Sequence, residues 1–162
     1  MRDLLITHAR YHHWATDRVL KSVEPIPDVD RKADAGLYFR SIHGTLNHLL
    51  LVDRLWRARF LRTTYAVRHL SDELESEFAP LAESLRRDTA TWESLVGSFS
   101  EAELDAPFTY ATLSGAPTTV RLADALLHVF NHGTHHRGQI SAIVTRLGFP
   151  TPETDLVDLA RM

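Results

Sequence analysis

Cysteine is absent from this 162-residue chain. Its absence excludes disulfide bonds, a cysteine nucleophile, thiolate–zinc sites and iron–sulfur ligation. The chain also lacks any apolar run that approaches the roughly 20 residues of a membrane span. The apolar run Leu4–Ile6 is far too short for the core of a secretion signal. We therefore expect a protein without a membrane partner, located in the cytoplasm, where proteins without disulfides are the rule.

A strong charge of one sign is also lacking. The formal net charge is −3 and the pI is near 6.3. This balance argues against a dedicated nucleic-acid binder, so no nucleic-acid partner is expected. One local basic cluster consists of Arg54, Arg57, Arg59 and Arg62. Acidic stretches flank it, and the ordinary interpretation is a solvated helix face.

Length and composition indicate a single domain that spans residues 1–162. Hydrophobic residues make up 44% of the chain, which is ordinary for a globular protein with a sizeable core. Such a core needs no structural metal to hold it together. Any metal site is then free to serve function rather than folding.

Four segments have helical periodicity. The first runs from about Asp3 to Val23 and ends at two prolines, and the second runs from about Ser41 to Leu61. The third is expected to open at Ser71, as an N-cap before acidic residues, and to continue to about Phe99. Pro80 predicts a kink in it, or the true helix start. The fourth runs from about Thr119 to Leu147 and ends at Gly148.

Two shorter elements complete the expected fold. The β-prone segment 107–118 around Ser114-Gly115 predicts a small hairpin or an extended crossover before the last helix. Residues Asp155–Leu159 predict one short helix near the end. Four long helices with one longer connection predict an all-α four-helix bundle, an architecture whose core commonly hosts metal sites.

Histidine is concentrated in one place. His128, His132, His135 and His136 fall within nine residues of the fourth helical segment. Residues four apart share a helix face, so His132 with His136, or His128 with His132, can hold one metal ion. The Glu of a helical H-E-x-x-H site is missing, because Gly133 follows His132. The spacing therefore predicts half of a metal site, without the zincin mechanism.

The third ligand is expected from the second helix. His48 shares a helix face with Val52 and Leu55, so it should point into the bundle. A single histidine on an apolar face is usually a core residue, but several imidazoles buried together need partners, and a shared metal supplies one. Asp53 lies about 140° around the helix from His48 and is not expected to be a ligand. Of the adjacent pair His12 and His13, at most one can face the core.

These residues resemble the DinB-like family, within the DinB/YfiT-like superfamily of metalloenzymes. The similarity covers nearly the whole chain and includes Tyr11–Leu20, Ser41–Trp56 and His128–Ile140. Within the last segment, Asn131–Gln139 is close to the family's signature. It implies an up-down-down-up four-helix bundle that often forms a homodimer. It also implies a divalent metal ion held by three histidines, one from the second helix and an H-x-x-x-H pair from the last. In this chain those are His48, His132 and His136.

The resemblance leaves the reaction open, because the superfamily includes transferases and isomerases that use small-molecule thiols as well as members without an assigned reaction. The leading hypothesis is a metal-dependent enzyme, either a thiol-dependent transferase or a hydrolase. The alternative is a non-catalytic metal-binding or stress-response module that acts through dimerisation. Three imidazoles suit Zn, Ni, Fe or Co. Asn47, His135 and Gln139 are candidates for orienting the ligands. Arg137 is a candidate for an anionic substrate group, or for a surface or dimer-interface role.

Overall fold

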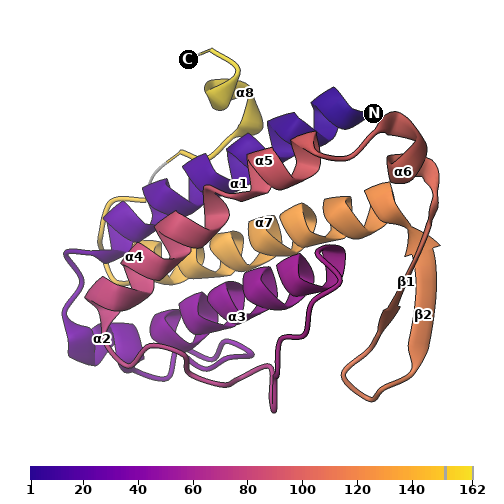
Figure 1. Cartoon of the computed structure of the whole chain (residues 1–162). Coiled ribbons are helices and arrows are strands. Elements are labelled where there is room, and N and C mark those ends of the chain that lie inside the picture. The colour runs from indigo at the N-terminus through magenta and orange to yellow at the C-terminus, as the bar shows by residue number, and fades with distance from the viewer. Residues whose placement is uncertain (152, 162) are drawn as a thin grey trace.

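Helices make up most of the chain, as the computed structural model shows over residues 1–151 and 153–161 (Figure 1). The order of elements is α1 (Arg2–Val23), α2 (Asp28–Lys32), α3 (Ile42–Phe60), α4 (Phe78–Thr89), α5 (Trp92–Gly97), α6 (Glu101–Asp105), β1 (Pro107–Ala111), β2 (Pro117–Arg121), α7 (Leu122–Arg146) and α8 (Leu156–Leu159). The expectation of a mainly helical fold with a small hairpin is confirmed.

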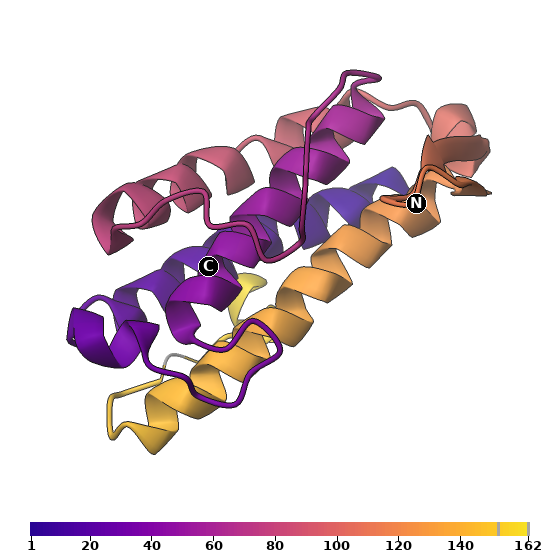
Figure 2. The same ribbon diagram turned by 90° about the horizontal axis from the view of Figure 1, so that it is seen from below.

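The long helices pack side by side. Helix α1 contacts α7, α4 and α5, and α3 contacts α4 and α7 (Figure 2). Helix α3 is buried along most of its length, because Leu46, Leu50 and Leu51 recur on its inner side together with aromatic residues. Its first turn is capped by the Ser41 hydroxyl, which accepts a hydrogen bond from the Gly44 N–H at 2.9 Å. These contacts fix α3 against α7, and so position the histidines that both helices carry.

Two apolar clusters fill the interior. One surrounds Trp92 and Phe130 near the hairpin, and the other surrounds Leu50 and Leu81 toward the opposite ends of the helices. Buried polar side chains also lie on the helices, and those of His12 and Arg137 fall at positions between the two clusters. Trp56 and Trp92 are buried within the single chain, so neither provides an exposed aromatic surface for a partner.

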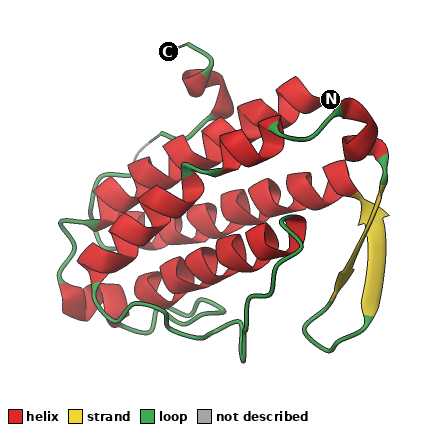
Figure 3. Cartoon of the chain, viewed as in Figure 1, coloured by secondary structure: helices red, strands yellow, loops and turns green. Residues whose placement is uncertain are grey.

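The predicted hairpin is present immediately before α7 (Figure 3). Strands β1 and β2 pair antiparallel, with Phe108 opposite Val120 and Tyr110 opposite Thr118. Gly115 has a φ of 82°, which a residue without a Cβ adopts readily. The prediction that the last helix begins at Thr119 is wrong by three residues. Thr119 is a strand residue, because the β-branched side chains of this segment pair across the hairpin instead.

The third predicted helix is corrected more substantially. Ser71 caps no helix, and α4 begins only at Phe78. The Asp72 carboxylate instead accepts hydrogen bonds from the backbone N–H groups of Arg68 and His69, a local turn that competes with helix formation. Pro80 lies in the first turn of α4, where its missing N–H costs nothing. The segment expected to be continuous to Phe99 is divided into α4 and α5.

The remaining boundaries agree with expectation within one or two residues for α1, α3 and the short helix α8. Helix α2 was not anticipated from the sequence. Within the described residues, no helix combines the length and apolar character that crossing a bilayer requires.

Candidate metal centre

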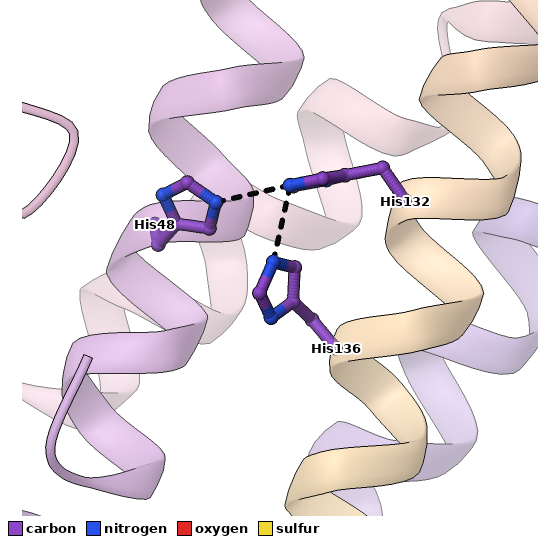
Figure 4. Close-up of side chains that lie close together, drawn as sticks. All are labelled: His48, His132 and His136. Carbon is purple, nitrogen blue, oxygen red and sulfur yellow. Dashed lines mark hydrogen bonds between the residues drawn. The ribbon is translucent and has the colours of Figure 1, made fainter. Parts of the chain in front are cut away.

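Three histidines from two helices converge on one point (Figure 4). His48 projects from the middle of α3, while His132 and His136 project from successive turns of α7. The Nε2 atom of His132 lies 3.1 Å from Nε2 of His48 and 3.1 Å from Nε2 of His136. One ring nitrogen from each residue lies within 4.8 Å of the other two. The i, i+4 pair and the third histidine therefore meet as the sequence predicted.

Hydrogen bonds fix the direction of two of these rings. The Nδ1–H of His48 donates to the backbone carbonyl of Leu70 at 2.9 Å. The Nδ1–H of His136 donates to Oε1 of Gln139 at 2.8 Å, and the Gln139 amide in turn donates to Nε2 of His135 at 3.1 Å. A neutral imidazole that donates from Nδ1 carries its lone pair on Nε2. Both lone pairs therefore point into the centre of the cluster.

The cluster is held in the neutral form. Burial, together with the neighbouring imidazoles, lowers the pKa of His48 to about 4 and that of His132 to about 3. Burial also lowers the pKa of His136. The burial penalty falls on the charged form, because a desolvated imidazolium loses its hydration. Near neutral pH all three rings are therefore neutral, and each offers a nitrogen lone pair, which is the state that a metal ion requires.

The donor set and its spacing fit a divalent transition metal. Two nitrogens that each lie about 2.0–2.1 Å from a zinc ion at tetrahedral angles are roughly 3.3 Å apart. The measured separations of 3.1 Å from His132 are close to that value. Three imidazoles leave at least one coordination position for water or substrate. This is the ligand number of catalytic rather than closed structural sites.

An aromatic ring covers one side of the cluster. Phe39, from the segment before α3, stacks on His48 with ring centroids 3.7 Å apart and an interplanar angle of 17°. The same ring meets His136 edge-on at 5.6 Å. This apolar contact keeps water from that side and strengthens electrostatic interactions within the cluster.

His128, the rival partner in the sequence analysis, is not part of this group. Its ring centroid lies 6.0 Å from that of His132, and its ring packs against Trp56 at 5.3 Å. The group that converges therefore contains His136. The sequence spacing alone left this choice open.

The candidates for orienting the ligands occupy different places. Gln139 contacts His136 directly, and His135 contacts Gln139. Asn47 bonds to loop backbone instead: its Oδ1 accepts from the N–H groups of Leu74 and Glu75 at 2.8 and 3.0 Å. That loop also carries the Leu70 carbonyl that orients His48. Asn47 thus acts on the cluster only through the loop that it holds.

A surface or interface role for Arg137 is wrong, because its side chain is only 3% exposed. Its Nη1–H donates to Nδ1 of His12 at 3.0 Å and to Thr16, and its Nη2–H donates to Thr134 at 3.0 Å. The opposite nitrogen of His12, Nε2, lies 3.2 Å from both oxygens of Asp53. Arg137, His12 and Asp53 form a polar network that ties α7 to α1 and α3.

Sequence reasoning missed this network, although two signals pointed to it. Only His12 of the pair His12–His13 is buried, as the pattern required. The second signal is Gly133, because a glycine inside a helix lowers its stability and so indicates a close approach of another group. A Cβ at Gly133 would lie 2.5 Å from the His12 ring, so only glycine leaves room for that ring against α7.

The described residues thus define a mainly helical protein with a three-histidine centre of metal-binding geometry between two long helices. Comparison with known proteins agrees. The sequence profile of the DinB family matches residues 1–162, and the chain belongs to the DinB family. It is 28% identical to Protein DinB of Bacillus subtilis (strain 168) over 169 residues, covering 96% of this chain and 92% of that protein.

Two solved structures share the fold. A DinB-like protein (YjoA) from Bacillus subtilis superposes with a TM-score of 0.66 at 16% identity, covering 94% of this chain and 98% of that one. A DinB-like protein from Bacillus cereus ATCC 10987 superposes with a TM-score of 0.64 at 14% identity, covering 86% and 90%.

Proposed function

We propose that this protein binds one divalent metal ion through His48, His132 and His136 and uses it as a metal-dependent enzyme. The observation that carries the proposal is the convergence of three neutral imidazoles, two of which have their Nε2 lone pairs fixed by hydrogen bonds on Nδ1. Zinc, nickel and iron all suit such a set of ligands. Gln139 and the Leu70 carbonyl hold the rings in place, as outer partners of metal ligands commonly do.

A bound metal would supply Lewis acidity, which generates a hydroxide or a thiolate near neutral pH. The three histidines hold the ion, and Phe39 excludes water from one side of the rings. The reaction class that we favour is thiol-dependent transfer, with hydrolysis as the second choice within the enzyme class. In a chain without cysteine, the sulfur would come from a small-molecule thiol that serves as cosubstrate.

A non-catalytic metal-binding or stress-response module is the second candidate. The close stacking of Phe39 on His48 favours it, because the ring limits access from one side. The two candidates differ in the metal's remaining positions. An enzyme needs an exchangeable position beside a cavity, whereas a binding module does not.

We also propose that α1, α3, the α4–α5 segment and α7 constitute one up-down-down-up four-helix-bundle domain that forms a homodimer. The likeness to the two solved DinB-like structures over most of the chain supports the bundle. The dimer depends on the family resemblance alone. Light scattering at micromolar concentration tests it, and a monomeric mass would contradict it.

The central test is the metal content of protein purified without a polyhistidine tag, for the wild type and for His132→Ala. His132→Ala should lose the metal, with a fall in affinity beyond the 10–100-fold typical of losing an outer hydrogen-bond partner. It should remain helical by circular dichroism, because the apolar clusters do not include His132. His13→Ala, a change on α1 away from the cluster, is the matched control and should retain the metal.

The cobalt form separates the two candidate functions. If a position on the ion is exchangeable, added thiols should change its d–d spectrum, and so should titration across neutral pH. A spectrum that is indifferent to both would support the binding module instead.

A further inference from the structure

A polar cavity lies at the end of α3 that is farther from Ser41. Its volume is about 440 Å³, and its walls are the last turns of α3, the segment 63–67 and the hairpin segment 109–113. In Figure 1 the hairpin lies beside this end of α3. None of the histidine ligands lines this cavity, so it is separate from the metal centre.

The charge on its walls is of one sign. Arg59 and Arg62 both line the cavity, and its described lining contains no aspartate or glutamate. Across residues 1–151 and 153–161, neither arginine has a carboxylate oxygen within 4 Å. Threonine hydroxyls and the phenols of Tyr65 and Tyr110 are the other polar groups of the wall. Two cations without a counterion make this a cavity for an anion.

Arg59 is not on a solvated face, contrary to the interpretation of the basic cluster from the sequence. Its Cζ lies 4.6 Å from the ring centroid of Trp56 and 4.7 Å from that of Tyr110, so the guanidinium contacts both aromatic rings. One Nη–H donates to the carbonyl of Ala111 at 3.0 Å. A guanidinium has five N–H donors, and a pair of them suits carboxylate or phosphate oxygens. The aromatic contacts hold the group in place for that role.

A continuous row of rings joins this arginine to the metal centre. Trp56 lies 4.9 Å from Tyr110 and 5.3 Å from His128, and His128 lies 6.0 Å from the ligand His132, all between ring centroids. On α3, His48, Leu55 and Arg59 follow the same helix face at steps of seven and four. The metal centre and the cavity therefore lie along one face of α3.

We propose that this cavity binds the anionic group, a carboxylate or a phosphate, of the substrate whose reacting atom is held at the three histidines. This inference rests on the proposed function, and it names the substrate class as a small organic anion. His48 and Arg59 are eleven positions apart, about 16 Å along a helix axis. The Arg59 side chain leans back toward the start of α3, so the molecule would span on the order of 10 Å.

The test uses a two-ended probe and its neutral analogue. In metal-loaded protein, 8-mercaptooctanoate should bind about 10–100-fold more tightly than 8-mercaptooctanol, since a charge-assisted hydrogen bond has that effect. Arg59→Gln should remove this preference and leave the affinity for the alcohol unchanged. Arg10→Gln, an equal change of charge at an exposed residue of α1, is the control and should keep the preference. Equal binding of both probes by the wild type would overturn the proposal, as would equal behaviour of the two variants.

A metal-free experiment separates failure of this subsite from failure of the metal site. Tryptophan fluorescence should report saturable binding of acetate or of inorganic phosphate at constant ionic strength, because Trp56 contacts Arg59. The anion that binds more tightly shows whether the cavity prefers a carboxylate or a phosphate group. Binding should be lost in Arg59→Gln and weakened in Arg62→Gln, with circular dichroism confirming that both remain folded. If the wild type binds the anion but no metal, the proposed function is refuted and the subsite stands. If anion binding survives in Arg59→Gln, the subsite is refuted whatever the metal content.

Discussion

Two polar groups that contain histidine pack against α7, the His12 network and the three-histidine cluster, and they differ in where their ring protons are. His12 accepts from Arg137 at Nδ1, so its Nε2–H donates to Asp53. His48 and His136 have the opposite tautomer, with Nδ1–H donating outward and Nε2 facing the cluster. In the first group the protein satisfies both nitrogens. In the second, the nitrogens facing one another need an atom from outside the chain.

The difference has an energetic side. In the His12 network, a guanidinium and a carboxylate lie on either side of a neutral ring, so the buried charges compensate one another. In the metal cluster three Nε2 atoms approach one another, and at most a shared proton can bridge two of them. The first arrangement stabilises the packing of α1, α3 and α7. The second costs stability until a cation binds, which is the usual compromise at a functional site.

Breaking the first network should have the largest effect on stability. Asp53→Ala leaves the His12 Nε2–H and the Arg137 charge without a partner in the core, so it should lower the free energy of unfolding by about 3–5 kcal/mol. Urea denaturation measures this. Asp124→Ala, which breaks an exposed ion pair with Arg121, is the matched control and should lower the free energy of unfolding far less, because solvent screens that pair. Similar losses in the two variants would show that the network does not hold the helices together.

Removing a hydrogen-bond partner of a cluster histidine should have the opposite effect, since it should weaken metal binding and leave the stability of the fold nearly unchanged. Gln139→Leu frees the His136 ring, so metal affinity should fall about 10–100-fold with little change in the free energy of unfolding of the metal-free protein. His135→Ala removes only the next contact outward and should have a smaller effect. Competition titration with a chelator gives both affinities. An unchanged affinity in Gln139→Leu would mean that the ring is held by packing alone.

The sequence predicted the metal cluster because its signals are local. Helix spacing places His132 on one face with His128 or His136, and His48 lies on an apolar face, so helix geometry directs such a set inward. The resemblance to the DinB-like family then selects His136. The His12 network could not be predicted in the same way. Its members are 41 and 125 positions apart, and only packing of three helices brings them together. Arg137 was therefore a candidate only for an anionic substrate group or for a surface or dimer-interface role, because arginine is rarely buried.

The helix boundaries show the same limit. α1 and α3 followed from periodicity and from their end signals. The start of α4 did not, because Ser71 and the acids after it match an N-cap signal as well as they match a turn. The choice is made by long-range bonds: His43 and Asn47 both donate to the Glu75 carbonyl. Nothing in the local sequence of residues 71–77 carries that information.

A matched pair of glycines tests how closely His12 is packed. Gly133→Ala places a methyl group 2.5 Å from the His12 ring, so it should destabilise the protein by about 1–3 kcal/mol despite the better helix propensity of alanine. At Gly138 a Cβ would meet nothing within 4 Å, so Gly138→Ala should stabilise the protein by up to about 1 kcal/mol. Thermal or urea denaturation of both variants measures the contrast. Stabilisation by both would show that the His12 ring can move aside freely.

The last prediction concerns pH. In the metal-free protein, burial lowers the pKa of His48 to about 4 and that of His132 to about 3, from about 6.5 in the unfolded chain. Between these values the unfolded chain binds protons that the folded chain does not. The free energy of unfolding should therefore reach its highest value above about pH 6.5, and it should decrease as the pH falls toward 4.

Each of the two histidines contributes at most about 1.4 kcal/mol per pH unit, less for His132, whose ring is partly exposed. Urea midpoints measured between about pH 7 and pH 4 in the presence of a chelator give the slope. His132→Gln removes one of the two groups, so its slope should be shallower. His13→Gln, the control on α1, should keep the wild-type slope. Equal slopes in the wild type and His132→Gln would mean that the cluster accepts a proton without cost, and its neutral, metal-ready state would then have no basis in burial.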